Sequence, residues 1–387
     1  LGPEQMLPLV EEIAAATALP VVVQPNAGLP RGVDGETVFP GTADEMGDYA
    51  ARFVAAGASL VGSCCGSTPT FTGSISDFAK EHPVPVREKP RGLAVASTRA
   101  VVRLGGGRRV AVIGERINPT GKSRLEGSLR EGSMSVVREF AVDQQHDGAD
   151  LLDVNVGAAG VDTSSVRPAA VGALSGISDL PLVLDDTHPE ALEAALKAYP
   201  GRALINSVSG SQAAIDAILP LAVRYGAAVL ILALDEDGIP SDADGRLAVA
   251  ARVREAAHAI GLTDVDLAVD CLVTTAATDP KSAGVTLEAL RVVARDWGLA
   301  TVLGVSNVSH GLPGRPWLNS AFLGMAAAAG LSAAIMNPSD LEMMRGLAAA
   351  NLLAGRDERA ERWIAWTKSE EAADAFVARV KASSRAR

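Results

Sequence analysis

Short apolar runs recur along the chain from residue 110, and Ala- and Leu-rich stretches with helical patterning separate them. The first run opens the segment VAVIGERINPTGK, where Asn118-Pro119-Thr120-Gly121 breaks the apolar pattern before a helical stretch begins. The runs lack polar alternation, as expected for strands that are covered on both faces. Seven more runs follow, at 151–156, 181–186, 203–208, 228–234, 266–272, 301–307 and 332–338.

Eight strand–helix units in series predict a (β/α)8 barrel, of the TIM-barrel class, over residues 110–355. No longer connection marks a reversal of strand order, and this favours a closed barrel over an open doubly wound sheet. We expect 89–109 to be a linker, because it carries prolines and charged residues and includes the triple glycine at 105–107. Residues 356–387 are charged and predict a C-terminal helical extension, with Trp363 and Trp366 on one possible docking stripe.

The first part of the chain, residues 1–88, predicts a smaller α/β segment. Helices are expected at 3–17, 43–57 and 69–82, with strands at 20–26 and 60–66 between them. This succession fits the last quarter of a second α/β barrel, which cannot close by itself. We therefore expect missing strands upstream of Leu1, or else apolar strand edges that stay exposed.

Polar residues cluster at one end of the predicted barrel strands. An Asp or Asn that closes a strand often caps the next helix, so a single such residue says little. Seven on one rim exceed what capping requires, because active sites of these barrels form at the carboxyl ends of the strands. Carboxylates and carboxamides suit a flat ligand rich in hydrogen-bond donors and acceptors, such as a pterin. The seven are Glu115, Asn155, Asp185, Asn206, Asp270, Asn307 and Asn337.

Composition narrows the class of protein. The 387 residues are 48% hydrophobic but only 4% aromatic, so Ala, Val and Leu make up the core of a globular protein. The formal net charge of −11 and the lack of basic runs argue against nucleic-acid and membrane partners. Neither a membrane span nor a signal peptide is visible, and the three cysteines do not make a disulfide scaffold. We expect a cytoplasmic protein.

The adjacent pair Cys64 and Cys65 follows a predicted strand in a glycine-flanked turn. Neighbouring cysteines rarely bond to each other because the geometry is strained. As thiolates they suit a soft metal such as Zn²⁺, although a zinc site needs further ligands and the sequence has no third cysteine nearby. Cys271 lies on a predicted barrel strand and is expected in the core.

Several motifs in fixed order resemble cobalamin-dependent methionine synthase over about residues 1–355. VVVQPNAGLP and VGSCCGSTP are similar to the end of that family's homocysteine-binding barrel. The following barrel resembles the family's methyltetrahydrofolate-binding barrel, and it is also similar to related corrinoid protein methyltransferases. The motifs of this second barrel are GERINPTGK, LLDVNVG, LDDTHPEAL, LINSVSG, VDCLV and GVSNVSHGLPGR.

The resemblance implies a role for each matching residue. Cys64 and Cys65 match two of three zinc-binding cysteines, and the third would lie just upstream of Leu1. Asp185, Asn206 and Asp270 are implied to hold the pterin ring, and Asn307 matches the residue near N5, so Asn307 and Asp270 are the implied catalytic residues. This sequence differs from the family's usual pattern at Asp186, His188 and Cys271. These positions affect the shape of the loops more than the hydrogen bonds to the pterin. The remaining implied folate-site residues are Glu115, Asp153, Asn155, His310 and Arg315.

The resemblance implies methyl transfer from 5-methyltetrahydrofolate to cob(I)alamin, as part of the methylation of homocysteine. The implied partner is a cobalamin-binding domain or a corrinoid protein, since no Asp-x-His-x-x-Gly run follows Gly355. Three alternatives remain: dihydropteroate synthase, a methyltransferase acting on a corrinoid iron–sulfur protein, and a folate-binding fragment without turnover. The first lacks its Lys-x-x-Arg-x-His signature here, and the second has no homocysteine module that would account for Cys64 and Cys65.

Overall fold

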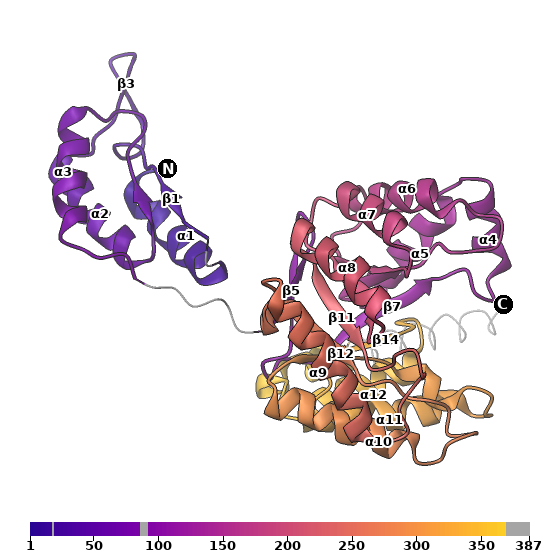
Figure 1. Cartoon of the computed structure of the whole chain (residues 1–387). Coiled ribbons are helices and arrows are strands. Elements are labelled where there is room, and N and C mark those ends of the chain that lie inside the picture. Colours follow the sequence, from indigo (N-terminus) through magenta and orange to yellow (C-terminus); the bar gives the residue numbers. More distant parts are fainter. Residues whose placement is uncertain (18, 86–91, 369–387) are drawn as a thin grey trace, which may run out of the picture. The chain divides into compact units, whose positions relative to one another are not determined.

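The computed structural model describes residues 1–17, 19–85 and 92–368, which form two compact units, 1–91 and 92–387 (Figure 1). Among the described residues, no helix is both long enough and apolar enough to cross a membrane. Much of the C-terminal extension predicted at 356–387 lies outside the described residues. Its described part holds the short turn η4 (Glu358–Ala360) and helical residues 361–368.

The second unit is a closed barrel of eight parallel strands in the order β10-β11-β12-β13-β14-β7-β8-β9 (Figure 1). All eight strands predicted from the apolar runs are present, so the predicted (β/α)8 fold is confirmed. Most of the strand residues are buried because the barrel interior covers one face and the helices cover the other. The strands are β7 (Ala111–Ile117), β8 (Leu151–Val154), β9 (Leu182–Asp185), β10 (Leu204–Ser209), β11 (Ala228–Leu232), β12 (Leu267–Asp270), β13 (Ala300–Gly304) and β14 (Ala333–Met336).

Helices follow the strands and bury one apolar face each against the barrel. Several begin with a side-chain cap, for example Asp340, whose carboxylate accepts the backbone N–H groups of Glu342 and Met343. The helices are α4 (Ser123–Arg130), α5 (Ser135–His146), α6 (Thr163–Ser175), α7 (Pro189–Ala198), α8 (Gln212–Tyr225), α9 (Ala243–Ala259), α10 (Ser282–Arg291), α11 (Arg315–Ala329) and α12 (Leu341–Leu353). Shorter helical segments are η1 (Asp264–Asp266), η2 (Val292–Asp296) and η3 (Val305–Ser309).

A hairpin closes the N-terminal end of the barrel, where the sequence had predicted part of a linker. Strands β5 (Leu93–Ala96) and β6 (Val101–Leu104) pair antiparallel within the span 89–109. Leu93, Val95 and Leu104 are fully buried and pack against the first residues of the barrel strands. Part of the predicted linker, the hairpin, therefore contributes to the barrel's core; residues 86–91 lie outside the described residues.

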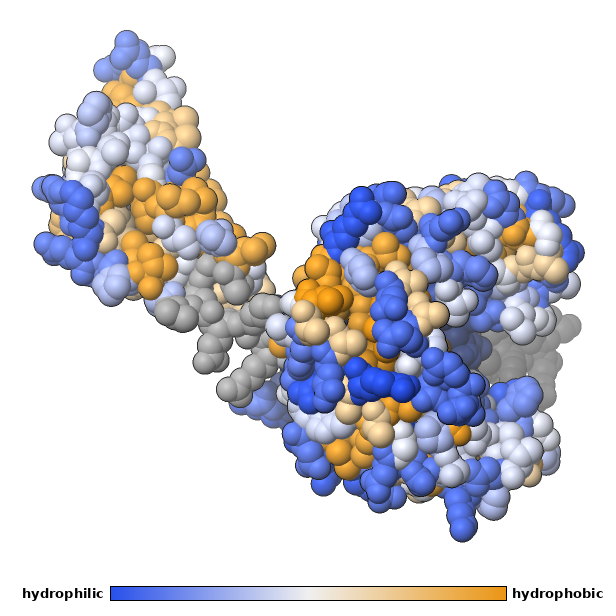
Figure 2. Space-filling model, in the orientation of Figure 1, coloured by the Kyte–Doolittle hydropathy of each residue, from blue (hydrophilic) through white to orange (hydrophobic). Residues whose placement is uncertain are grey.

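The first unit is an incomplete α/β layer, as the sequence predicts. Its elements are α1 (Pro3–Ala16), β1 (Val22–Val23), β2 (Arg31–Val33), β3 (Glu36–Val38), α2 (Ala43–Ala55), β4 (Leu60–Val61) and α3 (Pro69–Lys80). β1 and β4 form a two-stranded parallel sheet, and β2 and β3 form a separate hairpin that the sequence analysis missed. Val22 and Leu60 are 59% and 60% exposed on the small sheet, and Figure 2 shows apolar surface on this unit. Apolar strand surface is thus left uncovered, as expected for a sheet too small to close.

Candidate functional site

The carboxyl ends of the barrel strands carry the polar residues that the sequence singled out. Asp153, Asp185 and Asn206 lie on the neighbouring strands β8, β9 and β10, and Asn206 is level with Asp185 in the sheet register. Asp270 ends β12 and is level with Leu232 at the end of β11. Because all eight strands are parallel, these residues share one rim of the barrel.

Two carboxylate–carboxamide pairs join the three neighbouring strands. The Asn206 side chain donates from Nδ2 to Oδ1 of Asp153 across 3.2 Å. The Asn155 side chain donates from Nδ2 to Oδ2 of Asp185 across 2.9 Å. The four side chains therefore form one polar cluster, instead of pointing to separate sides of the molecule.

Burial makes this cluster resist a double negative charge. Asp153 is buried, and desolvation together with the nearby charge of Asp185 raises its pKa well above the ordinary value. Burial also raises the pKa of Asp185, although the hydrogen bond from Asn155 opposes the shift. Both shifts favour the protonated form, because burial and the mutual repulsion of the carboxylates oppose a second negative charge.

Arg167 supplies a buried positive charge beneath the rim, a feature that the sequence analysis missed. This residue is 1% exposed, and its Nη2 lies 2.7 Å from Oδ2 of Asp186. Its Nη1 donates to the Val154 carbonyl across 3.0 Å, at the end of β8. Asp186 also accepts a hydrogen bond from the backbone N–H of His188. The ion pair thus joins α6 to the ends of β8 and β9, and its guanidinium partly offsets the charge of Asp153 and Asp185.

Asp270 is a second buried carboxylate on the rim. Its Oδ1 accepts the backbone N–H of Leu272 across 2.7 Å, and the backbone of Gly304 also hydrogen-bonds to it. Burial dominates and raises the pKa of Asp270 to about 7. The next residue, Cys271, is buried as the sequence predicts, and burial raises the pKa of its thiol.

Asn307 lies in η3, immediately after β13, and its residue surface is exposed. If Gly304 carried a Cβ, that atom would lie 3.1 Å from Nδ2 of Asn307. The backbone of Gly304 also forms a hydrogen bond with Asp270. Asn307 and Asp270 therefore both border Gly304. His310, by contrast, is exposed and uses its backbone carbonyl to accept a hydrogen bond from Thr275.

Glu115 lies at the end of β7 within electrostatic reach of Lys122 and Arg315. Burial raises the pKa of Glu115, while the two cations act in the opposite direction. Arg315 begins α11 and is anchored by donating to Ser309 Oγ and to the Ser306 carbonyl, each across 3.1 Å. The structure thus places Glu115 within electrostatic reach of Arg315, and it adds Lys122 to this part of the rim.

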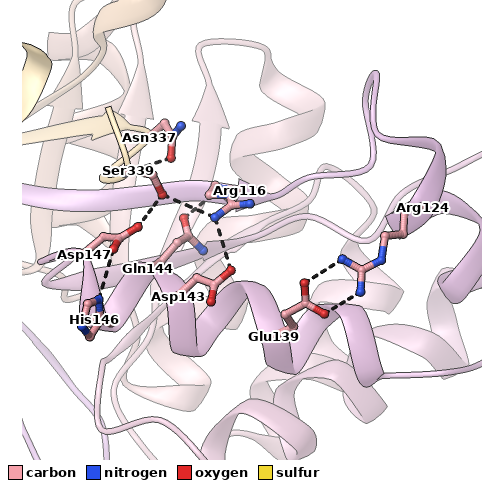
Figure 3. Close-up of polar contacts among 9 residues, drawn as sticks. All are labelled: Arg116, Arg124, Glu139, Asp143, Gln144, His146, Asp147, Asn337 and Ser339. Carbon is pink, nitrogen blue, oxygen red and sulfur yellow. Dashed lines mark hydrogen bonds and ion pairs between the residues drawn. The ribbon is translucent and has the colours of Figure 1, made fainter. Parts of the chain in front are cut away.

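The neighbour of Glu115 is held by a network that joins β7 to α5 and to the loop after β14 (Figure 3). Buried Gln144 accepts the backbone N–H of Arg116 at Oε1 across 2.8 Å. The Arg116 guanidinium approaches Asp143 and Ser339 and lies 4.6 Å from the centre of the Phe140 ring. Gly114 leaves room for Gln144, since a Cβ there would be 2.4 Å from Oε1. In the sequence, Gly114 is therefore the local feature that indicates a close approach of another side chain to β7.

The two adjacent cysteines lie in the loop after β4 of the first unit, both exposed. Their Sγ atoms are 3.9 Å apart, close to the roughly 3.8 Å that separates two thiolates on a tetrahedral zinc ion with ~2.3 Å bonds. The Cys64 N–H donates to the Pro25 carbonyl and the Cys65 N–H to Asn26 Oδ1, which fixes the turn. Within the described residues, no group of three His, Cys, Asp or Glu side chains could hold a metal ion. The pair therefore fits as two zinc ligands of a larger set.

Comparisons with known proteins match both units. Residues 114–337 match the pterin binding enzyme family, and residues 1–79 match the homocysteine S-methyltransferase family. The chain is 33% identical over 355 residues to methionine synthase from Mycobacterium tuberculosis, covering 88% of this chain and 30% of the relative. Methionine synthase from Mycobacterium leprae is 32% identical over 360 residues with the same coverage. The chain thus spans about 30% of the length of these curated relatives.

Solved structures agree on the fold. Dihydropteroate synthase from Xanthomonas albilineans, solved with 4-aminobenzoic acid, has a TM-score of 0.52 and 18% identity, covering 68% of this chain and 98% of that chain. The 7,8-dihydropteroate synthase from Vibrio fischeri has a TM-score of 0.50 and 14% identity, covering 68% and 99%. At such low identity the likeness concerns the barrel and not the reaction.

Proposed function

Because the chain belongs to the pterin binding enzyme family, and because its sequence matches a segment of methionine synthases, we propose that its barrel is a folate-dependent methyltransferase module. Its substrate would be 5-methyltetrahydrofolate, and the N5 methyl group would pass to cob(I)alamin. The observation that carries the proposal is the polar cluster of Asp153, Asn155, Asp185 and Asn206 on three adjacent strand ends.

The cluster suits the edge of a pterin ring. The ring presents an amide, ring nitrogens and an exocyclic amine, so it needs both acceptors and donors fixed in one plane. Asp185 and Asp270 would accept from the amine and ring N–H groups, and the Asn206 amide would serve the ring carbonyl or a ring nitrogen. Asn155 and Arg167 would act indirectly, because they hold and partly neutralise the carboxylates.

Methyl transfer from N5 is difficult because a tertiary amine is a poor leaving group. The methyl carbon leaves without the electrons of its bond to nitrogen, so that pair stays on N5 and must be stabilised by a proton. Solvent water would supply this proton, because Asn307 is exposed. We assign Asn307 to stabilise the protonated nitrogen, with its side-chain carbonyl accepting a hydrogen bond from N5–H. The buried carboxylates would keep the ring in one orientation relative to the methyl acceptor.

The first unit would contribute to the homocysteine half of the reaction. Cys64 and Cys65 would supply two thiolate ligands to a Zn²⁺ ion, with further ligands from outside the described residues. Zinc lowers the pKa of a bound thiol, so that homocysteine reacts as a thiolate near neutral pH. The cob(I)alamin acceptor would be presented by a cobalamin-binding domain or a corrinoid protein.

The proposal is tested by mixing the chain with 5-methyltetrahydrofolate and free cob(I)alamin and following methylation of the cobalamin by absorbance. We expect turnover by the wild type. In Asn307→Ala the rate of transfer should fall by at least about tenfold while the Kd for the folate changes by less than about threefold, because the bond to N5 strengthens in the transition state.

If the wild type bound folate but transferred no methyl group, the barrel would be a folate-binding scaffold and not a methyltransferase. Equal losses of rate and affinity in Asn307→Ala would contradict the role of its amide at N5.

A further inference from the structure

Two connected cavities lie at the end of the barrel opposite the polar rim. One, of about 510 Å³, is lined by β6, by the residues that precede β7 and β8, and by residues after α12. The other, of about 220 Å³, lies between α12 and the helical residues 361–368. Arg109, Arg356 and Arg362 line both cavities, so the two form one continuous depression. The larger cavity by itself is within the roughly 300–1,000 Å³ of small-molecule sites.

The larger cavity is strongly basic although the chain carries a net charge of −11. Five arginines line it, with a single carboxylate from Asp150. That carboxylate is already engaged, because Arg109 Nη1 donates to its Oδ2 across 2.8 Å. The lining arginines are Arg103, Arg108, Arg109, Arg356 and Arg362.

Three of these arginines already form contacts within the barrel. Arg356 donates to the carbonyls of Ala327 and Leu331 at the end of α11, where a cation stabilises a helix C-terminus. Arg109 holds Asp150, and Arg108 makes one long contact with the Gly105 carbonyl. Arg103 and Arg362 differ, since no side-chain hydrogen bond or ion pair engages either guanidinium within residues 92–368. Two guanidinium groups without a partner among the described residues, in a basic depression, favour the binding of an anion.

One wall of the smaller cavity is aromatic and apolar. Trp363 and Trp366 line it together with Met344 and Leu347 of α12. The two indole rings have centroids 6.0 Å apart and are tilted by 38°. Asp357 accepts the backbone N–H groups of Arg362 and Trp363, and so caps the segment that carries both residues. The cap holds an aromatic wall next to the arginine cluster.

We propose that this depression is a binding site for a nucleoside polyphosphate. The phosphates would lie among Arg103, Arg108 and Arg362, and the base would contact the Trp363 indole in the smaller cavity. Guanidinium groups form charge-assisted, often bidentate, hydrogen bonds to phosphate, and indoles stack on bases. The site lies at the opposite end of the barrel from the polar rim, so it would regulate or anchor the module and would not take part in methyl transfer.

Isothermal titration calorimetry of the full chain with ATP, tripolyphosphate and adenosine, in magnesium-free buffer at low salt, tests the proposal. We expect one ATP per chain, with tripolyphosphate about tenfold weaker and adenosine weaker still, since the two cavities contribute separately. Arg103→Gln and Arg362→Gln should each weaken ATP by about fivefold. Trp363→Ala should weaken ATP by about tenfold and leave tripolyphosphate unchanged.

Arg138→Gln is the matched control, because Arg138 is an exposed arginine on the outer part of α5 and lines neither cavity. Thermal melting of each variant checks folding, and unchanged 5-methyltetrahydrofolate affinity in Arg103→Gln shows that the two sites are separate. No heat with ATP would overturn the proposal, as would equal losses in the control. Equal affinity for ATP and tripolyphosphate, both insensitive to Trp363→Ala, would also overturn it, because nonspecific attraction would then account for binding.

Discussion

At the scale of single residues, the barrel rim combines buried carboxylates with amides that hold them. Asp153 and Asp185 lie close enough to raise the cost of a second charge, and Arg167 partly offsets that cost from below. The sequence indicates the carboxylates because each one ends an apolar run. It does not indicate Arg167 or Gln144. A charged or polar residue within a helical pattern is expected to be exposed, and only the fold shows that these two are buried.

Asp270 gives the protein a pH-dependent stability. Its folded-state pKa of about 7 lies above the ordinary value, so the folded chain holds the proton more tightly than the unfolded chain. The resulting stabilisation is full below pH ~4 and is lost as the pH rises through about 7. We expect Asp270→Asn, which cannot ionise, to lose less stability than the wild type between pH 5 and pH 8.5, by roughly 2–3 kcal/mol.

Urea unfolding at the two pH values measures this difference. Parallel loss of stability in the wild type and in Asp270→Asn would show that Asp270 ionises at its ordinary pKa in the folded protein.

At the scale of elements, the predicted strand–helix succession is confirmed for all eight barrel strands. An unbroken run such as Val229 to Leu232 on β11 can lie only where both faces are covered, so the pattern alone indicates a parallel strand. The hairpin β5–β6 was missed because each strand has four residues and is flanked by arginine and glycine. Its apolar partners are barrel residues that lie far along the chain, which local patterning does not show.

The hairpin should contribute strongly to the stability of the barrel. Leu104 is fully buried between β6 and the barrel strands, so Leu104→Ala leaves a cavity and should lower the free energy of unfolding by about 2–5 kcal/mol. Val101→Ala on the same strand is the control, because Val101 is 61% exposed and its loss should cost less than about 0.5 kcal/mol. Urea denaturation followed by circular dichroism compares them. Similar losses in the two variants would mean that the hairpin is not part of the barrel's core.

At the scale of the whole molecule, the chain consists of two compact units with separate chemistry. The first carries a cysteine pair suited to a soft metal, and the second carries a polar rim suited to a pterin. Sequence motifs were sufficient to tell these units apart. The resemblance also implied that Cys64 and Cys65 are two ligands of a larger set, and the structure places their Sγ atoms 3.9 Å apart.

The two functions should separate by mutation. We expect the double variant Cys64→Ser and Cys65→Ser to bind less zinc than the wild type, because serine is a poor zinc ligand. Its rate of methyl transfer from 5-methyltetrahydrofolate to cob(I)alamin should stay within about twofold, since the cysteines belong to a separate unit and share no described side-chain partner with the rim residues. Metal analysis and the absorbance assay give the two values. A loss of rate as large as that of Asn307→Ala would contradict the separation.

Calorimetric titration with 5-methyltetrahydrofolate tests the central claim most directly, namely that the rim of Asp153, Asn155, Asp185 and Asn206 holds a pterin. We predict saturable binding of one folate per chain, weakened by at least about tenfold in Asn206→Ala, which leaves Asp153 without its hydrogen bond. Arg138→Gln, outside the rim, should bind as the wild type does. Undetectable binding by the folded wild type, or wild-type affinity in Asn206→Ala, would contradict the assignment.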